Sequence, residues 1–166
     1  MISPYDPAIH DVSTFDCGED ALTRWLRHSA GQSQRRDAAR TFVAVAGGRR
    51  VIGYYATVVA ELRHDRASPN VARGMSRHFP IPVAIVARLA VDTDAQGRGV
   101  GALLLSDALT RVLAAAEHVA IRAVVVHAMS AAAAAFYERF GFKPLADEPR
   151  TLMITLDELR RSREPQ

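Results

Sequence analysis

The segment that most constrains the fold is a buried strand that gives way to a helix through a glycine-rich loop. Residues 83–91 read Val-Ala-Ile-Val-Ala-Arg-Leu-Ala-Val, an almost continuous apolar run that predicts a strand buried on both faces of a sheet. Residues 99–117 have the amphipathic spacing of a long helix, and Gly97, Gly99 and Gly101 lie at its start. Such a loop leaves several backbone N–H groups open at the positive end of a helix dipole, so it predicts a phosphate or pyrophosphate site.

This loop differs from the two best-known glycine-rich phosphate loops. It lacks the Gly-Lys-Ser/Thr ending of the P-loop. Its Gly-x-Gly-x-Gly spacing does not match the dinucleotide fingerprint, and no βαβ pattern opens the chain. Glycines that serve only a tight strand–helix turn are the simpler alternative.

The rest of the chain follows the order of an α/β protein with a mixed sheet. Helical spacing predicts the helices, β-branched runs predict the strands, and Gly47-Gly48 predicts a hairpin turn. The expected elements are helices at 19–29 and 30–38, hairpin strands at 41–46 and 51–59, the strand at 83–91, the helix at 99–117, a strand at 122–127, a helix at 130–140 and a strand at 152–156. Residues 61–80 look irregular because prolines interrupt a polar stretch. No linker or repeat divides the sequence, so we expect one domain over residues 1–166.

Composition excludes several classes of protein. Hydrophobic residues make up 49% of the 166 residues and charged residues 23%, as in an ordinary globular protein. The single cysteine, Cys17, excludes an internal disulfide framework and a multi-cysteine metal site, and we expect no bound metal. The start of the chain has neither the basic nor the apolar region of a secretory signal, and no apolar run approaches the roughly 18 residues of a membrane span. We therefore expect a cytoplasmic protein that does not contact membranes.

The basic residues are unevenly distributed. The net charge is +3, and all but one of the 21 basic residues are arginine, the exception being Lys143. Seven arginines lie between Ala21 and Arg50, against one acid, Asp37. Because guanidinium groups suit phosphate, this segment points to an anionic partner. A solvated helix face would explain the same arginines.

Two motifs resemble those of the GNAT acetyltransferase superfamily. Gln96-x-x-Gly99-x-Gly101 follows a Leu-Ala-Val-Asp strand end, as in the superfamily's acyl-CoA-binding motif. The run from Ser130 to Phe142, with Tyr137 and a Gly-Phe ending, resembles its later helix. The motifs cover residues 83–142 and agree with the superfamily in order and spacing. The resemblance implies an N-acetyltransferase that uses acetyl-CoA, with a splayed, mixed central β-sheet flanked by helices.

Shorter motifs over nearly the whole chain resemble a narrower group, the tRNA-acetylating GNAT toxins of type II toxin–antitoxin systems. These motifs are Phe15-Asp-Cys-Gly, Leu22-x-x-Trp25-Leu26, Arg40-Thr-Phe-Val, Gly53-Tyr-Tyr, Pro80-Ile-Pro, Arg88-Leu-Ala-Val and Val126-His-Ala. This resemblance implies acetylation of the α-amine of an aminoacyl-tRNA, which blocks translation. It also implies a homodimer and a ribbon–helix–helix antitoxin that neutralises the toxin and connects it to DNA only through their complex.

The resemblance also implies roles for particular residues. Backbone groups of Leu89, Ala90 and Val91 would pair with the pantetheine arm. The pyrophosphate would bind at the loop and first helical turn, which comprise Gln96, Gly97, Arg98, Gly99, Val100, Gly101 and Ala102. Ser130 stands where many members have Asn, and its hydroxyl can cap the helix. Phe136 would pack in the core or against pantetheine.

Tyr137 is the expected catalytic residue, because a neutral phenol can donate a proton to the departing CoA thiolate. Tyrosine at this position could instead only close the core. Arg35, Arg36 and Arg40 are the expected tRNA-binding residues, through phosphate contacts that would make binding salt-dependent. The same arginines could pair with an acidic antitoxin tail. Cys17 is expected to be a small buried group rather than a nucleophile.

The strand at 83–91 contains no carboxylate, whereas many lysine-acetylating relatives place a Glu near this point. An α-amine, with a pKa of about 7.7–8.0, is about one-quarter neutral near pH 7.4, against about 0.1% for lysine. The missing base therefore favours an α-amine acceptor, although His127 or Glu61 could supply a base. Two alternatives remain open: an acetyltransferase for a small amine or a protein N-terminus, and a CoA-binding regulatory module without turnover.

Overall fold

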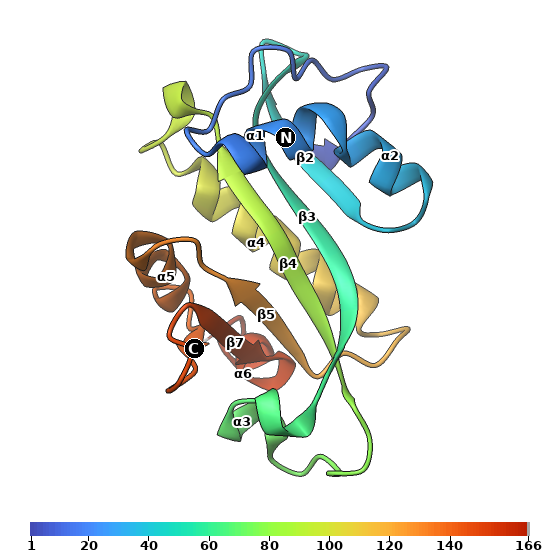
Figure 1. Cartoon of the computed structure of the whole chain (residues 1–166), viewed down its shortest axis with the longest axis vertical. Helices are drawn as coiled ribbons and strands as arrows, with labels where there is room; N and C mark the ends of the chain where they lie inside the picture. Colours follow the sequence, from blue (N-terminus) through green and yellow to red (C-terminus); the bar gives the residue numbers. More distant parts are fainter. Residues whose placement is uncertain (166) are drawn as a thin grey trace. The chain divides into compact units, whose positions relative to one another are not determined.

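Figure 1 shows the computed structural model, which describes residues 1–165. Within these residues the strands form a seven-stranded sheet in the order β1-β2-β3-β4-β5-β7-β6. The strands are β1 (Ile2–Pro4), β2 (Arg40–Ala46), β3 (Arg50–Leu62), β4 (Ile81–Val91), β5 (Ala123–His127), β6 (Lys143–Pro144) and β7 (Thr151–Thr155). The helices are α1 (Asp20–His28), α2 (Ala30–Arg35), α3 (Pro69–Ala72), α4 (Val100–Ala115), α5 (Ala131–Glu138) and α6 (Leu156–Arg161), with short 3-10 turns η1 (His64–Arg66) and η2 (Thr93–Ala95). The pairs β1–β2, β2–β3, β5–β7 and β6–β7 are antiparallel, so the expected mixed α/β fold is confirmed, with a mostly antiparallel sheet.

The chain clusters into two compact units, and the long strands β3 and β4 contribute to both. The first unit comprises Met1–Val58 and Val86–Thr110. Its core contains Tyr5, Phe15, Cys17, Leu26, Ala30, Val43, Val51, Tyr54 and Ala90. Apolar residues of α1 and α2 pack here on β2 and β3, which fixes the amino-terminal helices against the sheet.

The second unit comprises residues 59–85 and those from 111 onward. Its core contains Val71, Ile81, Val83, Ala123, Val125 and Met153. Helix α6 begins with a capping box in which Thr155 and Glu158 each bind the other's backbone N–H. Burial alone would raise the pKa of Glu158, but hydrogen bonds from Thr155 and Lys143 lower it.

The observed elements depart from the sequence predictions mainly where segments are short. Residues 61–80 are more regular than expected, because β3 continues to Leu62 and the turn η1 and helix α3 follow. Helix α2 ends at Arg35 rather than at 38, and α5 ends at Glu138 rather than at 140. The two- and three-residue strands β6 and β1 and the six-residue helix α6 were not predicted, since such lengths carry no periodic signal. None of the helices in residues 1–165 has the length and apolar character needed to cross a bilayer.

Candidate active site

In the first unit, the buried carboxylate of Asp92 stabilises the segment that leads into the glycine-rich loop. This side chain caps η2 by accepting from the backbone N of Asp94 at 3.0 Å, and it also accepts from the backbone N of Asp16 at 3.2 Å. Arg50 completes its environment with an ion pair at 3.3 Å. The end of β4 is thereby fixed to the start of β3 and to the segment that precedes α1.

Gln96 also supports the loop. Its amide nitrogen donates to the carbonyl oxygens of Val91 at 2.9 Å and Cys17 at 3.2 Å. The sequence motif predicted Gln96 as part of the pyrophosphate site. In the structure its side chain bonds to the protein, so this residue positions the loop.

The backbone of the loop adopts conformations at two positions that favour glycine. Gly97 and Gly99 have φ values of +78° and +81°, which L side chains rarely adopt. A Cβ at either position would meet no heavy atom within 4 Å, so the loop backbone faces open space. Helix α4 begins at Val100, and Arg98 is exposed beside it. The loop can therefore present N–H groups and a helix N-terminus to a pyrophosphate.

The first turns of α4 pack closely on β3. A Cβ on Gly53 would lie 2.9 Å from Leu104 and 3.1 Å from Val100. Only glycine allows this close approach, so Gly53 determines how near the N-terminal turns of α4 lie to the sheet. Leu89, Ala90 and Val91, predicted to carry pantetheine, form the last three residues of β4, with Ala90 buried in the core.

Arg88 lies directly before these three residues and is held by an aromatic stack. Its guanidinium group lies 4.2 Å from the centroid of Trp25, which in turn stacks on Tyr54 at 5.9 Å. The Tyr54 hydroxyl donates to the carbonyl oxygen of Leu22 at 2.7 Å, and burial raises its pKa. The Arg88 guanidinium group is thus fixed in position near the end of β4, a strand that contains no carboxylate.

In the second unit, Tyr137 is buried in α5 between Phe136 and Phe142, whose rings meet it edge-on at 5.3 and 5.7 Å. Burial raises the pKa of Tyr137 to about 12, so the phenol stays protonated at neutral pH. Its hydroxyl makes no hydrogen bond among the residues that the structure describes, yet it is not one of the fully enclosed unpaired polar atoms. The hydroxyl is therefore accessible and free to donate to an incoming group.

Two further residues predicted from the sequence lie on the same helix. The Ser130 hydroxyl caps α5 by accepting from the backbone N of Ala133 at 3.1 Å, which confirms the expected cap. Phe136 is half-buried and packs on Phe140 at 5.2 Å as well as on Tyr137. Contacts of Ser130 and Phe136 with CoA stay predictions.

The two residues considered as bases, Glu61 and His127, line one cavity of about 140 Å³ in the second unit. Its floor is apolar, and its polar lining also includes Arg66, Glu148 and Thr151. Nδ1 of His127 lies 3.1 Å from the Thr151 hydroxyl, which donates to Glu148 at 3.3 Å. The sequence did not point to Glu148 or Thr151, because strand pairing between β5 and β7 brings them to His127.

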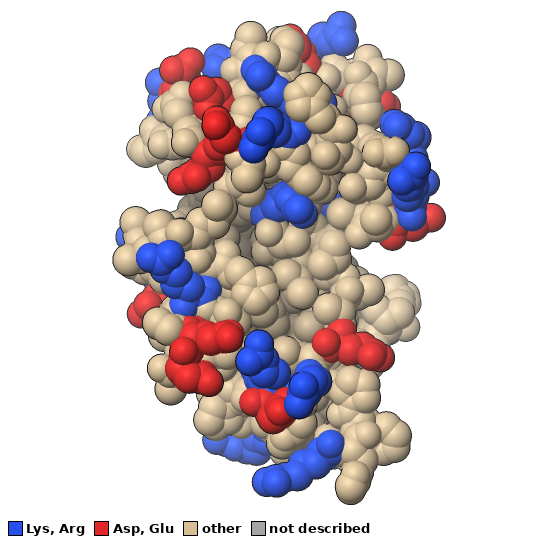
Figure 2. Space-filling model, viewed as in Figure 1, with Lys and Arg blue, Asp and Glu red and all other residues tan. Residues whose placement is uncertain are grey.

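The arginines of the basic segment have different environments. Arg40 is engaged, with an ion pair to Asp37 at 2.6 Å and a hydrogen bond to the carbonyl oxygen of Gln34 at 3.1 Å. Arg35 and Arg36 are exposed at the end of α2. Figure 2 shows basic side chains interleaved with acidic ones on the visible face. The predicted tRNA contacts are thus best carried by Arg35 and Arg36, with Arg40 shaping the local structure.

Cys17 is buried, and its sulfur lies 3.3 Å from the Thr23 hydroxyl, in agreement with a structural role. Over the described part of the chain, no group of three or more metal-ligating side chains is brought together. Tyr137, Glu61 and His127 belong to the second unit, whereas Arg88 and the glycine-rich loop belong to the first.

Comparison with known proteins agrees with this geometry. The acetyltransferase (GNAT) domain family matches residues 37–144, a range that includes β2 to β5, the glycine-rich loop and Tyr137. A curated relative, the "tRNA-acetylating toxin" of Mycobacterium tuberculosis, is 39% identical over 150 residues, which cover 90% of this chain and 89% of that protein. The chain belongs to the GNAT acetyltransferase family and is an N-acetyltransferase that uses acetyl-CoA.

Two solved structures of the toxin AtaT resemble the whole fold. AtaT complexed with acetyl-methionyl-tRNAfMet superposes with a TM-score of 0.87 at 26% identity, covering 98% of each chain. A tyrosine-to-phenylalanine mutant of AtaT, bound to the C-terminus of the antitoxin AtaR and to acetyl-CoA, gives a TM-score of 0.82 at 27% identity, covering 98% of this chain and 96% of that one.

Proposed function

We propose that this chain transfers the acetyl group of acetyl-CoA to the α-amine of an aminoacyl-tRNA, and that it acts as a toxin that blocks translation. The observation that carries the proposal is the chemistry of β4, which presents Arg88 and contains no carboxylate. A lysine acceptor needs a base to lose its proton, because its pKa is about 10.4. An α-amine, with a pKa of about 7.7–8.0, is partly neutral near pH 7.4 and does not depend on such a base.

In the proposed reaction, one group of residues binds acetyl-CoA and another affects the transfer of the proton. Backbone N–H groups around Gly97 and Gly99 hold the pyrophosphate, and the end of β4 orients the pantetheine arm. The amine nitrogen attacks the thioester carbonyl carbon, a C–N bond forms, and the C–S bond breaks. The proton lost by nitrogen is taken up at sulfur, which yields the amide and the free thiol.

Tyr137 stabilises the sulfur as it leaves. A phenol with a pKa of about 12 is a weaker acid than a thiol with a pKa of about 8.5, so full proton transfer to sulfur is uphill. Its contribution is a hydrogen bond to the developing thiolate, made in a buried site where such bonds are strong. The net proton on sulfur then comes from the amine.

The cavity lined by Glu61 and His127 is the proposed site of the aminoacyl group. Its volume of about 140 Å³ is close to the roughly 150 Å³ that holds a benzene-sized group. Its apolar floor suits an uncharged side chain of that size. His127, oriented by Thr151, is placed to accept the amine proton through a water.

Arg35 and Arg36 are the proposed phosphate contacts for the tRNA acceptor stem. The proposal extends to a homodimer in the cytoplasm and to neutralisation by a ribbon–helix–helix antitoxin. The similarity to a toxin solved with an antitoxin segment and with an acetylated tRNA supports the antitoxin and tRNA parts of this proposal.

The test uses purified protein, labelled acetyl-CoA and a pool of charged tRNAs, with uncharged tRNA and Tyr137→Phe as controls. Label is expected only on charged tRNA and only with the unmodified protein, and sorting the labelled species names the amino acid. Reversing charge at Arg35 and Arg36 should reduce tRNA acetylation but leave acetylation of a small amine nearly intact. Label on small amines or protein N-termini, with none on charged tRNA, would overturn the proposal.

A further inference from the structure

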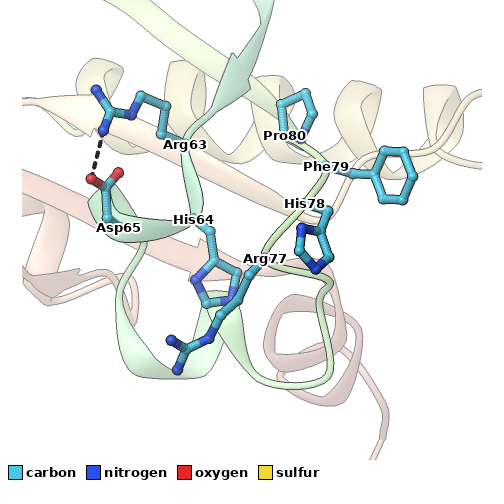
Figure 3. Close-up of a pocket in the computed structure, with 7 residues that line it drawn as sticks. All are labelled: Arg63, His64, Asp65, Arg77, His78, Phe79 and Pro80. Atoms are coloured by element: carbon cyan, nitrogen blue, oxygen red, sulfur yellow. Dashed lines mark hydrogen bonds and ion pairs between the residues drawn. The ribbon is translucent and has the colours of Figure 1, made fainter.

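A second basic surface lies in the connection between β3 and β4, which continues from the strand end that carries Glu61. Residues 63–80 contain four arginines and one acid. Seven residues of this connection line an open hollow of about 410 Å³, shown in Figure 3: Arg63, His64, Asp65, Arg77, His78, Phe79 and Pro80. We call the group formed by Arg63, His64, Arg77, His78 and Phe79 the basic–aromatic surface.

Most of the polar groups on this surface are not used by the protein itself. Arg63 pairs with Asp65 at 2.7 Å. In residues 1–165, the side chains of His64, Arg77 and His78 make no ion pair or side-chain hydrogen bond. Phe79 is 71% exposed, and Figure 3 shows its ring projecting outward beside His78. The exposed Phe79 ring and the unpaired Arg77 guanidinium group contribute little to holding this fold together.

The segment that displays these side chains is anchored. The Arg122 guanidinium group donates to three carbonyl oxygens of the connection, those of Val71 at 3.0 Å, Asn70 at 3.1 Å and Arg73 at 2.9 Å. Val71 is buried in the core of the second unit, and the Ser68 hydroxyl caps α3. The middle of the connection is thus tied to the core of the second unit, between the two ends that carry the basic–aromatic surface.

We infer that the basic–aromatic surface binds a single-stranded stretch of RNA, with Arg77 on a phosphate and Phe79 stacked on an unpaired base. Proteins that bind single-stranded nucleic acid combine cations along the backbone with exposed aromatic rings for the bases. A single RNA strand supplies, in each nucleotide, both a phosphate for Arg77 and a planar base for Phe79, whereas a carboxylate-rich peptide matches Arg77 alone unless it also carries an apolar side chain. The inference rests on the proposed function, since it gives the tRNA substrate a second contact besides Arg35 and Arg36.

The test measures binding of a fluorescent single-stranded ribo-oligonucleotide and of whole tRNA to the full-length protein, by anisotropy at several salt concentrations. Phe79→Ala should weaken oligonucleotide binding by about 5- to 150-fold, the effect of losing one stacked base, and Phe79→Tyr should restore it. Arg77→Ala should reduce the slope of log affinity against log salt by about 0.7. Val119→Ala and Arg160→Ala, at exposed apolar and basic positions of the same unit, are the matched controls and should bind normally.

The outcomes separate this inference from the proposed function. If Phe79→Ala and Arg77→Ala bind RNA like the controls while the unmodified protein still acetylates charged tRNA, the inference is wrong and the function stands. If RNA binding depends on Phe79 and Arg77 but charged tRNA is not acetylated, the surface stands and the function is wrong. Weakened binding of an acidic peptide, with RNA binding unchanged, would also overturn the inference.

Discussion

Tyr54 in the first unit and Tyr137 in the second are both buried, and burial raises the pKa of both, yet their hydroxyl groups are used differently. The Tyr54 hydroxyl is bonded to the carbonyl oxygen of Leu22, and its ring supports Trp25 and Arg88. The Tyr137 hydroxyl has no such partner in residues 1–165. A raised pKa therefore does not by itself distinguish the two tyrosines, and the difference between them lies in whether the hydroxyl group already has a partner.

The largest expected effect tests this contrast directly. Tyr137→Phe removes the hydrogen-bond donor but keeps the ring, so kcat should fall by about 10²- to 10³-fold. The free energy of unfolding should change by less than about 0.5 kcal/mol, because no intramolecular hydrogen bond is lost. Steady-state acetylation and urea unfolding measure the two quantities. A variant that keeps its kcat but unfolds more easily would make Tyr137 structural.

The next prediction concerns the first unit, where backbone N–H groups of the glycine-rich loop are proposed to bind acetyl-CoA. Gly99→Ala places a side chain at φ +81°, at a cost of about 1–2 kcal/mol, and should raise the KM for acetyl-CoA about tenfold while kcat is kept. Gly48→Ala in the β2–β3 turn is the matched control, because its φ of +86° imposes similar strain and its Cβ would also meet nothing within 4 Å. Equal KM values for the two variants would contradict the proposed binding of the pyrophosphate by the backbone of the loop.

Tyr54→Phe should give the reverse of Tyr137→Phe. Loss of its 2.7 Å hydrogen bond leaves the carbonyl of Leu22 without this partner and should lower the free energy of unfolding by about 1 kcal/mol. The kcat should stay within about twofold of the unmodified value, because the ring still supports Trp25. Denaturant unfolding and the acetylation assay on the same preparation measure the free energy of unfolding and kcat. A large fall in kcat would show that the two tyrosines do not differ in role.

The last effect is confined to alkaline pH. The folded-state pKa of Tyr137 is about 12, above the value of 10 for an exposed tyrosine. Its contribution to stability is therefore fully present below pH 10 and is lost as pH rises from 10 towards 12. Tyr137→Phe should lose less stability over that range than the unmodified protein, as followed by circular dichroism. Parallel curves for the two proteins would contradict the raised pKa.

The sequence predicted those parts of the fold and site that depend on local pattern. The strand at 83–91, the glycine-rich loop and the following helix appear as β4, the loop and α4, because apolar runs, glycines and helical spacing act over a few residues. The family match confirms the superfamily assignment made from these motifs. The joint placement of Glu61 and His127 was not predictable, since it depends on pairing between strands far apart in the chain.

The environment of each arginine was likewise not predictable from the sequence. Arg35, Arg36 and Arg40 look alike in the sequence, but only the third is engaged by Asp37 and Gln34. Arg50 is likewise tied to Asp92, 42 residues further along the chain. The sequence identifies a basic segment by its number of arginines. Only the structure shows which of these arginines already have partners within the protein.

The bonds beneath the glycine-rich loop also bear on the order in which the protein folds. Asp92 and Gln96 are joined to Asp16 and Cys17 across 76 and 79 residues of chain. Contacts of such high sequence separation form late, because a long loop must close before they stabilise anything. A folding intermediate in which α4 is already helical would therefore still lack an ordered loop. The capacity to bind acetyl-CoA is expected to appear only in the final folding step, and any local opening of residues 16–17 in the native protein would remove it again.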